Sequence, residues 1–149
     1  LERENFSYDL YAETQFHCGI LNLSDYSILI ISTHPEYWST DMYYTLKKWV
    51  FDEGGKLLYL GGNGLNCEVE FLDEYTITVK NGSLGSRKIR EMGIASRFAH
   101  RNESEANLLG VVFTDPGIMT GAPYKVLDSS HWVFSNTNLI NLDKCQRNA

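Results

Sequence analysis

Two short apolar runs joined by a helix-length segment constrain the fold of this chain more than any other feature of its sequence. Residues 27–33 (SILIIST) are a continuous β-branched run, typical of a strand that is buried on both faces of a sheet. Residues 56–60 (KLLYL) form a second predicted strand. Strands joined by a helix through short links lie parallel, with a right-handed crossover. The pattern therefore predicts an α/β fold with an open, mostly parallel, flavodoxin-like sheet and helices on both faces.

The predicted helix between these strands has recognisable ends. Ser39 is suited to the N-cap, Asp41 falls in the first turn, and Gly54 is suited to the position just after the last turn. The apolar positions share one face at helical spacing: Met42, Leu46, Trp49 and Val50. This face should pack against the sheet.

Other segments give weaker signals. Residues 6–13 alternate in polarity and predict a strand, and residues 108–113 (LLGVVF) predict another buried strand. Residues 69–79 fit a hairpin or an irregular strand pair. Residues 80–101 contain six of the 13 basic residues, which fits a solvated helix and loop or, alternatively, an anion or partner surface.

Size and charge limit the classes of function. A chain of 149 residues predicts a single domain over residues 1–149, and the net charge of −6 argues against a nucleic-acid partner. No apolar run approaches the 18 residues that a membrane span needs. Three cysteines without a paired spacing argue against a secreted disulfide framework, so we expect a cytoplasmic protein. The chain begins with Leu1 inside what looks like a folded unit, which suggests a fragment of a longer chain.

Polar residues follow both predicted parallel strands. His34 and Glu36 follow the first strand, on either side of Pro35, and Asn63 lies in a glycine-rich turn after the second. Ligands of parallel α/β sheets bind beyond the carboxyl ends of the strands. If the two strands are neighbours, these three side chains meet at one edge of the sheet, and Pro35 restricts the turn that holds two of them.

These residue types can perform hydrolytic chemistry. An imidazole moves protons near neutral pH, a carboxylate orients it or binds a hard cation, and an amide can hold a carbonyl oxygen. The alternative is structural: His34 and Glu36 cap the following helix, and Asn63 supports a tight turn. Cys67 also follows a glycine-rich turn, but no nucleophile-elbow motif surrounds it, and a small buried apolar role fits it better.

Most of the chain resembles the C-terminal catalytic region of the N,N-dimethylformamidase large (beta) subunit family. The resemblance depends on residues 34–39 (HPEYWS), on the helix end at residues 54–55 and on residues 61–64 (GGNG). Residues 131–139 (HWVFSNTNL) look like a later block of the family. Of these, the HPEYWS block is the specific one.

This resemblance implies a class I glutamine amidotransferase-like α/β domain without that fold's cysteine nucleophile. It implies hydrolysis of a small amide, N,N-dimethylformamide in the family, to formate and dimethylamine. The family uses a mononuclear iron held by two tyrosines and one glutamate. By motif position Glu36 corresponds to the glutamate ligand of the metal, and His34 and Asn63 correspond to catalytic residues. Metal-assisted attack of water on the formyl carbon is the implied mechanism.

The resemblance also implies that parts of the active site lie elsewhere. The family's tyrosine ligands lie well upstream of the HPEYWS block, and Tyr8, Tyr11 and Tyr26 are too close to it to correspond. A further catalytic glutamate lies downstream of the last matching block. The expected partner is therefore the remainder of a longer chain, and we expect this fragment to be inactive in isolation. A small subunit is a further expected partner, and a second copy is expected because a truncated domain exposes surface that promotes self-association. The alternative function is a non-catalytic module that binds a small ligand or a partner chain in the same cleft.

Overall fold

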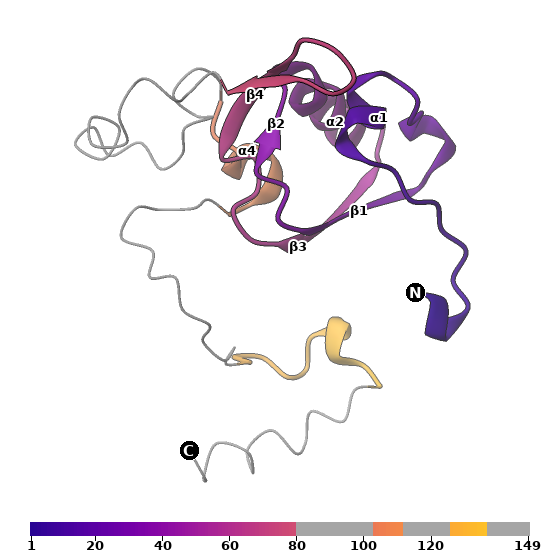
Figure 1. The fold of residues 1–149 in the computed structure, drawn as a ribbon. Coiled ribbons are helices and arrows are strands. Elements are labelled where there is room, and N and C mark those ends of the chain that lie inside the picture. The colour runs from indigo at the N-terminus through magenta and orange to yellow at the C-terminus, as the bar shows by residue number, and fades with distance from the viewer. Residues whose placement is uncertain (80–102, 112–125, 137–149) are drawn as a thin grey trace, which may run out of the picture. The chain divides into compact units, whose positions relative to one another are not determined.

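The computed structural model describes residues 1–79, 103–111 and 126–136 (Figure 1). Contacts divide the chain into two units, Leu1–Gly117 and Ile118–Ala149, and each is described by itself. A single domain over residues 1–149 stays a prediction. The basic segment at residues 80–101 lies outside the described residues.

A βαβ unit forms the centre of the first unit. Strand β1 (Ile28–Thr33), helix α2 (Thr40–Phe51) and strand β3 (Lys56–Gly61) follow one another in the chain. The strands pair in parallel, with Ile28 opposite Lys56 and Thr33 opposite Gly61. The predicted strand–helix–strand order and the parallel pairing are confirmed, and their carboxyl ends meet at one edge.

Helix α2 has the ends that its sequence predicts. The Ser39 Oγ accepts a hydrogen bond from the Met42 N–H (3.3 Å), so Ser39 is the N-cap. After the last turn Gly54 has a φ of 79°, a conformation that favours glycine. Gly55 then passes so close to Trp49 that a Cβ on it would lie 2.2 Å from the indole ring. The turn therefore requires glycine at Gly55 for packing and at Gly54 for backbone conformation.

One face of α2 forms most of the core, together with residues from the neighbouring elements. Figure 1 shows α1 and α2 on the same side of the β1–β3 pair. The buried core residues are Phe16, Leu21, Leu23, Ile31, Trp38, Met42, Tyr43, Leu46, Trp49, Leu65 and Leu108. Three of the four predicted helix positions are in this set, and Val50 packs against it.

A second sheet, separate from the first, has three strands and is mixed. Strand β2 (Tyr37–Trp38) pairs in parallel with β4 (Cys67–Phe71), which pairs antiparallel with β5 (Ile77–Val79). The β4–β5 pair is the hairpin that was one of two alternatives for residues 69–79. The described part of the chain is thus a small α/β structure with one parallel pair and one mixed three-stranded sheet.

Short helical turns complete the described residues. They are η1 (Glu2–Glu4), α1 (Glu13–His17), η2 (Leu23–Asp25), α4 (Ala106–Leu109) and, in the second unit, η3 (Trp132–Phe134). Within the described ranges no helix is long and apolar enough to cross a membrane.

The strand prediction for residues 6–13 is wrong. Residues 6–12 are irregular and exposed, and α1 begins at Glu13, where the Gln15 side chain accepts a hydrogen bond from the Ala12 N–H (2.8 Å). Alternating polarity predicts a strand only if a neighbouring strand pairs with it, and these residues pair with none in the described sheets.

Two expectations about buried strands are also wrong. Within residues 108–113 the described part holds the end of α4, and Gly110 terminates the helix with a φ of 73°. Strand β1 is not buried on both faces, because Ile28 is 55% exposed and Ile30 is 37% exposed. A β-branched run therefore predicted the strand correctly and its burial incorrectly.

Candidate active site

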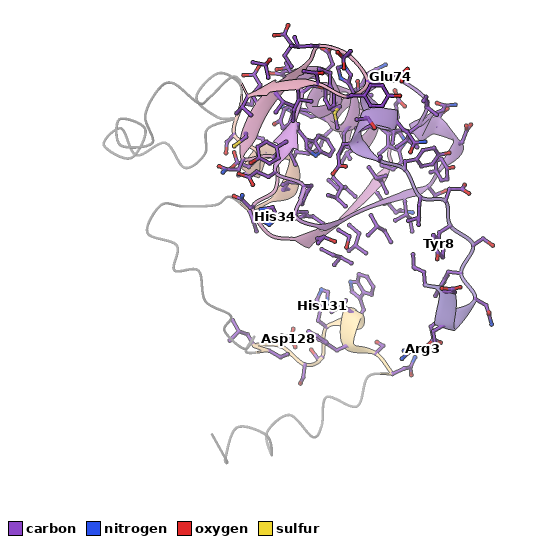
Figure 2. The ribbon with its side chains drawn as sticks, in the orientation of Figure 1. Arg3, Tyr8, His34, Glu74, Asp128 and His131 are labelled. Atoms are coloured by element: carbon purple, nitrogen blue, oxygen red, sulfur yellow. The ribbon has the colours of Figure 1, made fainter. Side chains whose placement is uncertain are left out.

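The first half of the site is the turn that follows β1. Thr33 ends the strand with a φ of 74°, an unusual conformation for a β-branched residue, and turns the chain out of the sheet. The Glu36 N–H then donates a hydrogen bond to the His34 carbonyl (2.9 Å), which closes a tight turn around Pro35. This turn brings the side chains of His34 and Glu36 together at the end of β1. Figure 2 labels His34 in this turn.

Backbone hydrogen bonds join this turn to the segment that follows β3. In each bond an N–H group of the later segment donates to a carbonyl oxygen of the earlier one. The pairs are Gly62 N–H to Thr33 O (3.1 Å), Leu65 N–H to Pro35 O (2.7 Å) and Cys67 N–H to Glu36 O (2.9 Å). Gly61 lies so close that a Cβ on it would be 2.8 Å from the Thr33 carbonyl oxygen. The two loops are thus held together by their main chains, as the expected convergence requires.

The three predicted side chains meet at one ring nitrogen. The His34 Nε2 lies 3.2 Å from the Glu36 Oε2 and 3.2 Å from the Asn63 Nδ2. The predicted convergence of His34, Glu36 and Asn63 is therefore observed. The structural alternative, in which His34 and Glu36 cap the following helix, is not observed. Ser39 caps α2, and β2 lies between Glu36 and the helix. The catalytic and metal-binding roles stay predictions.

The two hydrogen bonds of the His34 Nε2 exclude each other, because each needs a different protonation of this nitrogen. A protonated Nε2 donates to the Glu36 carboxylate, whereas an unprotonated Nε2 accepts from the Asn63 amide N–H. One nitrogen cannot do both at once. The arrangement therefore has a hydrogen-bond partner for the ring in either protonation state, which is what a group that takes up and returns a proton needs.

The site is partly open. The His34 side chain is 56% exposed, whereas that of Glu36 is 17% exposed. The Asn63 Oδ1 is buried and has no hydrogen-bond partner within the described residues. An acceptor in this position costs free energy unless a ligand or a further part of the protein satisfies it.

Backbone strain is concentrated around the site. Asn63 and Leu65 have φ values of 54° and 53°, and Thr33 on the facing loop has 74°. Each such residue costs of the order of 1–3 kcal/mol, and strain of this kind clusters at functional sites. Asparagine tolerates this conformation better than most residues. Threonine and leucine rarely adopt it, so the sequence did not indicate positive φ values at Thr33 and Leu65.

Two residues near the site were not predicted to belong to it. The Tyr59 hydroxyl, from β3, accepts a hydrogen bond from the Gly64 N–H (2.9 Å), and burial raises the pKa of this phenol. The buried Cys67 thiol donates to the Glu36 Oε1 (3.5 Å). Tyr59 lies in a predicted strand whose pattern indicates only burial. Cys67 was considered as a nucleophile because it follows the glycine-rich turn, but nothing in its local sequence indicated a bond to Glu36.

The other titratable candidates lie in different surroundings. His17 bonds through Nδ1 to the Ser39 Oγ (3.0 Å) and stacks on Phe71, so it supports the start of α2. In the second unit the His131 Nδ1 accepts from the Val133 N–H (3.3 Å) at the start of η3. His17 therefore joins α1 to the start of α2, and His131 caps its own short helix.

Two of the tyrosines upstream of the turn, Tyr11 and Tyr26, form a cluster with Asp9. The Tyr26 hydroxyl donates to the Asp9 Oδ2 (2.6 Å) and lies 2.9 Å from the Tyr11 hydroxyl. The hydrogen bond to Asp9 raises the pKa of Tyr26. The hydroxyls of Tyr11 and Tyr26 therefore bond within this cluster, and their exclusion as metal ligands stays a prediction.

A hollow of about 320 Å³ lies at the opposite end of the β1–β3 pair. Its lining includes Ser27 and Lys56, at the amino ends of the strands, and none of the predicted site residues. Ligands of parallel sheets bind at the carboxyl ends, so the chemistry of the residues argues for the edge with His34.

Comparison with known proteins identifies the family. The family model for the N,N-dimethylformamidase beta subunit-like, C-terminal region matches residues 1–149. No curated protein and no solved structure matches the chain. The match covers the whole sequence, including both loops of the site. The chain therefore belongs to the N,N-dimethylformamidase beta subunit-like, C-terminal family.

Proposed function

We propose that this chain supplies part of the active site of a metal-dependent amide hydrolase that acts on a small linear amide such as N,N-dimethylformamide. His34 and Asn63 are the catalytic residues, and Glu36 is a ligand of a mononuclear iron. The observation that carries the proposal is the meeting of these three side chains around the His34 Nε2, at 3.2 Å from each neighbour. Membership of the family supports the same reaction class.

Amide hydrolysis needs a group that both accepts and returns a proton. Water adds to the formyl carbon and loses a proton, the carbon–nitrogen bond then breaks, and the departing amine gains a proton. The His34 Nε2 can perform both transfers, because Asn63 stabilises its unprotonated form and Glu36 its protonated form. The Asn63 amide can also donate to the carbonyl oxygen of the substrate, where negative charge develops.

The residues present fit one part of an iron site. The Glu36 carboxylate provides a hard oxygen donor at the edge of the sheet, and the buried, unsatisfied Asn63 Oδ1 is a second polar oxygen nearby. Within the described ranges no group of three His, Cys, Asp or Glu residues could hold a metal. The remaining ligands, two tyrosines by the family resemblance, come from outside these residues. When bound, the ion acts as a Lewis acid and lowers the pKa of its water.

The assembly proposed for this site is larger than the described structure. The β1–β3 pair and its helix are then part of an open, flavodoxin-like sheet of the amidotransferase type. The partners are the remainder of a longer chain and a small subunit, in keeping with the subunit named in the family description. A homo-oligomer and a cytoplasmic location complete the proposal.

The replacement Glu36→Gln in the longer protein that contains this chain tests the proposed function. It removes the charge of the carboxylate and keeps its shape, so we expect loss of bound iron and a fall in amide hydrolysis of at least about 100-fold. Iron content is measured by elemental analysis, and hydrolysis by release of the amine.

The matched control is Glu74→Gln, the same change at an exposed residue between β4 and β5. This variant should retain iron and turnover. Iron and turnover that survive Glu36→Gln would contradict the proposal. If the parent protein neither binds iron nor hydrolyses amides, but binds a ligand or partner at this edge of the sheet, the result would favour the alternative function of a non-catalytic binding module.

A further inference from the structure

Cys67 contacts both the main chain and the side chain of Glu36. We propose that the Cys67 thiol is a positioning residue, which holds the Glu36 carboxylate in the orientation in which it faces His34. The proposal rests on the proposed function, since it concerns the residue assigned there as a metal ligand. It gives a role to a buried thiol that the hydrolytic chemistry does not otherwise use.

The main chain fixes where the thiol lies. Cys67 is the first residue of β4, opposite Tyr37 of β2, and its N–H donates to the Glu36 carbonyl (2.9 Å). Its side chain is fully buried. The separation of the two residues therefore depends on strand pairing rather than on the conformations of surface side chains.

The side-chain contact acts on the orientation of the carboxylate. The terminal torsion of a glutamate side chain is broad and has no strong preference of its own. In this site the Cys67 Sγ–H donates to Oε1 (3.5 Å), while Oε2 lies 3.2 Å from the His34 Nε2. Different partners on the two oxygens select one orientation of the carboxylate plane. Among the side chains of the described residues, the partly exposed His34 is the other group bonded to this carboxylate.

The surroundings of Cys67 favour a donor role over a nucleophilic one. Reactive cysteines lie in electropositive and partly exposed sites. Cys67 is fully buried and its sulfur faces a carboxylate. Carboxylates that bind metals are themselves hydrogen-bonded by neighbouring groups, and loss of such a neighbour typically costs about 10- to 100-fold in metal affinity or activity.

The first experiment measures the thiol hydrogen bond directly. In the full chain with Cys18→Ser and Cys145→Ser, Cys67 is the only thiol, and its S–H stretching band is recorded by infrared spectroscopy. We expect the band at a lower frequency than that of the exposed Cys18 thiol, recorded with Cys67 and Cys145 replaced by serine. Glu36→Leu, which removes both oxygens, should move the Cys67 band towards that of Cys18. A band unchanged by Glu36→Leu would overturn the proposal; Glu74→Leu is the control.

The second experiment tests the consequence for the site in the iron-loaded parent protein. Cys67→Ala should lower iron affinity and kcat by about 10-fold or more with little change in KM, because the thiol does not touch the substrate. Cys67→Ser, which keeps a donor, should restore most of the loss, and Cys18→Ala should have no effect.

The outcomes separate the two proposals. Wild-type iron affinity and kcat in Cys67→Ala would overturn the positioning role. It would also be overturned if Cys67→Ser and Cys67→Ala lost activity equally and in proportion to the fall in their unfolding midpoints, because the losses would then reflect stability alone. If the parent protein neither binds iron nor hydrolyses amides, the proposed function fails, whereas the infrared band still decides whether Cys67 holds Glu36.

Discussion

At the scale of single residues, the site depends on one imidazole nitrogen placed between an amide and a carboxylate. His34 and Glu36 come from one turn and Asn63 from another, and each distance to the His34 Nε2 is 3.2 Å. Asn63 serves the site in two ways, because its φ of 54° shapes the loop and its amide faces the ring. The two contributions can be separated by substitution.

Asn63→Gly and Asn63→Ala form such a pair. Glycine adopts a φ of 54° without strain, so Asn63→Gly should change the free energy of unfolding by less than about 0.5 kcal/mol while lowering amide hydrolysis by about 100-fold. Asn63→Ala should lose the same activity and about 1 kcal/mol of stability in addition. Urea unfolding and amine release measure the two effects. Full activity in Asn63→Gly would contradict a catalytic role for the amide.

At the scale of elements, α2 connects the sheet to the segment at residues 103–109. Its Tyr43 hydroxyl donates to the Ser104 carbonyl (3.1 Å), and Lys47 forms an ion pair with Glu103. Burial, followed by the nearby charge of Glu103, raises the pKa of Tyr43 to about 12. The hydrogen bond from Lys47 lowers the pKa of the Glu103 carboxyl below its usual value of 4.5.

The Lys47–Glu103 pair predicts a specific dependence of stability on pH. A carboxyl group whose pKa is lower in the folded state contributes stability above its unfolded pKa and loses that contribution as pH falls through the folded pKa. Lys47→Met should therefore reduce the loss of unfolding free energy below pH 4.5 relative to the wild type. Urea unfolding at a series of pH values checks this, with the exposed Lys56→Met as control. Parallel pH profiles for wild type and Lys47→Met would contradict it.

At the scale of the whole molecule, the described structure covers the β1–β3 pair on one face only. Ile31 points into the core, while its neighbour Ile30 lies on the exposed face. Successive residues of a strand point to opposite faces, so the same substitution at both positions measures how well each face is covered.

Ile30→Thr and Ile31→Thr make this comparison. At the buried position a hydroxyl replaces packed methyl groups, and we expect a loss of about 1–3 kcal/mol in unfolding free energy. At the exposed position the loss should stay near 0.5 kcal/mol. Chemical denaturation measures both. Equal losses would show that the face with Ile30 is covered in solution.

Local patterns in the sequence predicted the centre of the fold well. The βαβ unit, the N-cap at Ser39 and the glycine at position 54 all depend on interactions within a few residues, which a linear sequence records. The convergence of His34, Glu36 and Asn63 followed because parallel neighbours end at the same edge of a sheet. The strand predicted at residues 6–13 was wrong, and so was the strand predicted at 108–113 over its described part, residues 108–111, since alternating or apolar runs also occur where no partner strand is available.

The sequence was therefore sufficient for the parallel strand pair, its helix and the three polar side chains at the strand ends. Only the tertiary structure showed that β1 is exposed on one face and that the Cys67 thiol, 31 residues from Glu36, bonds to its carboxylate. The physical reason is the range of the interactions. Periodicity and caps act between neighbours in the chain, whereas burial and hydrogen bonding between separate strands depend on which segments pack together and in which register.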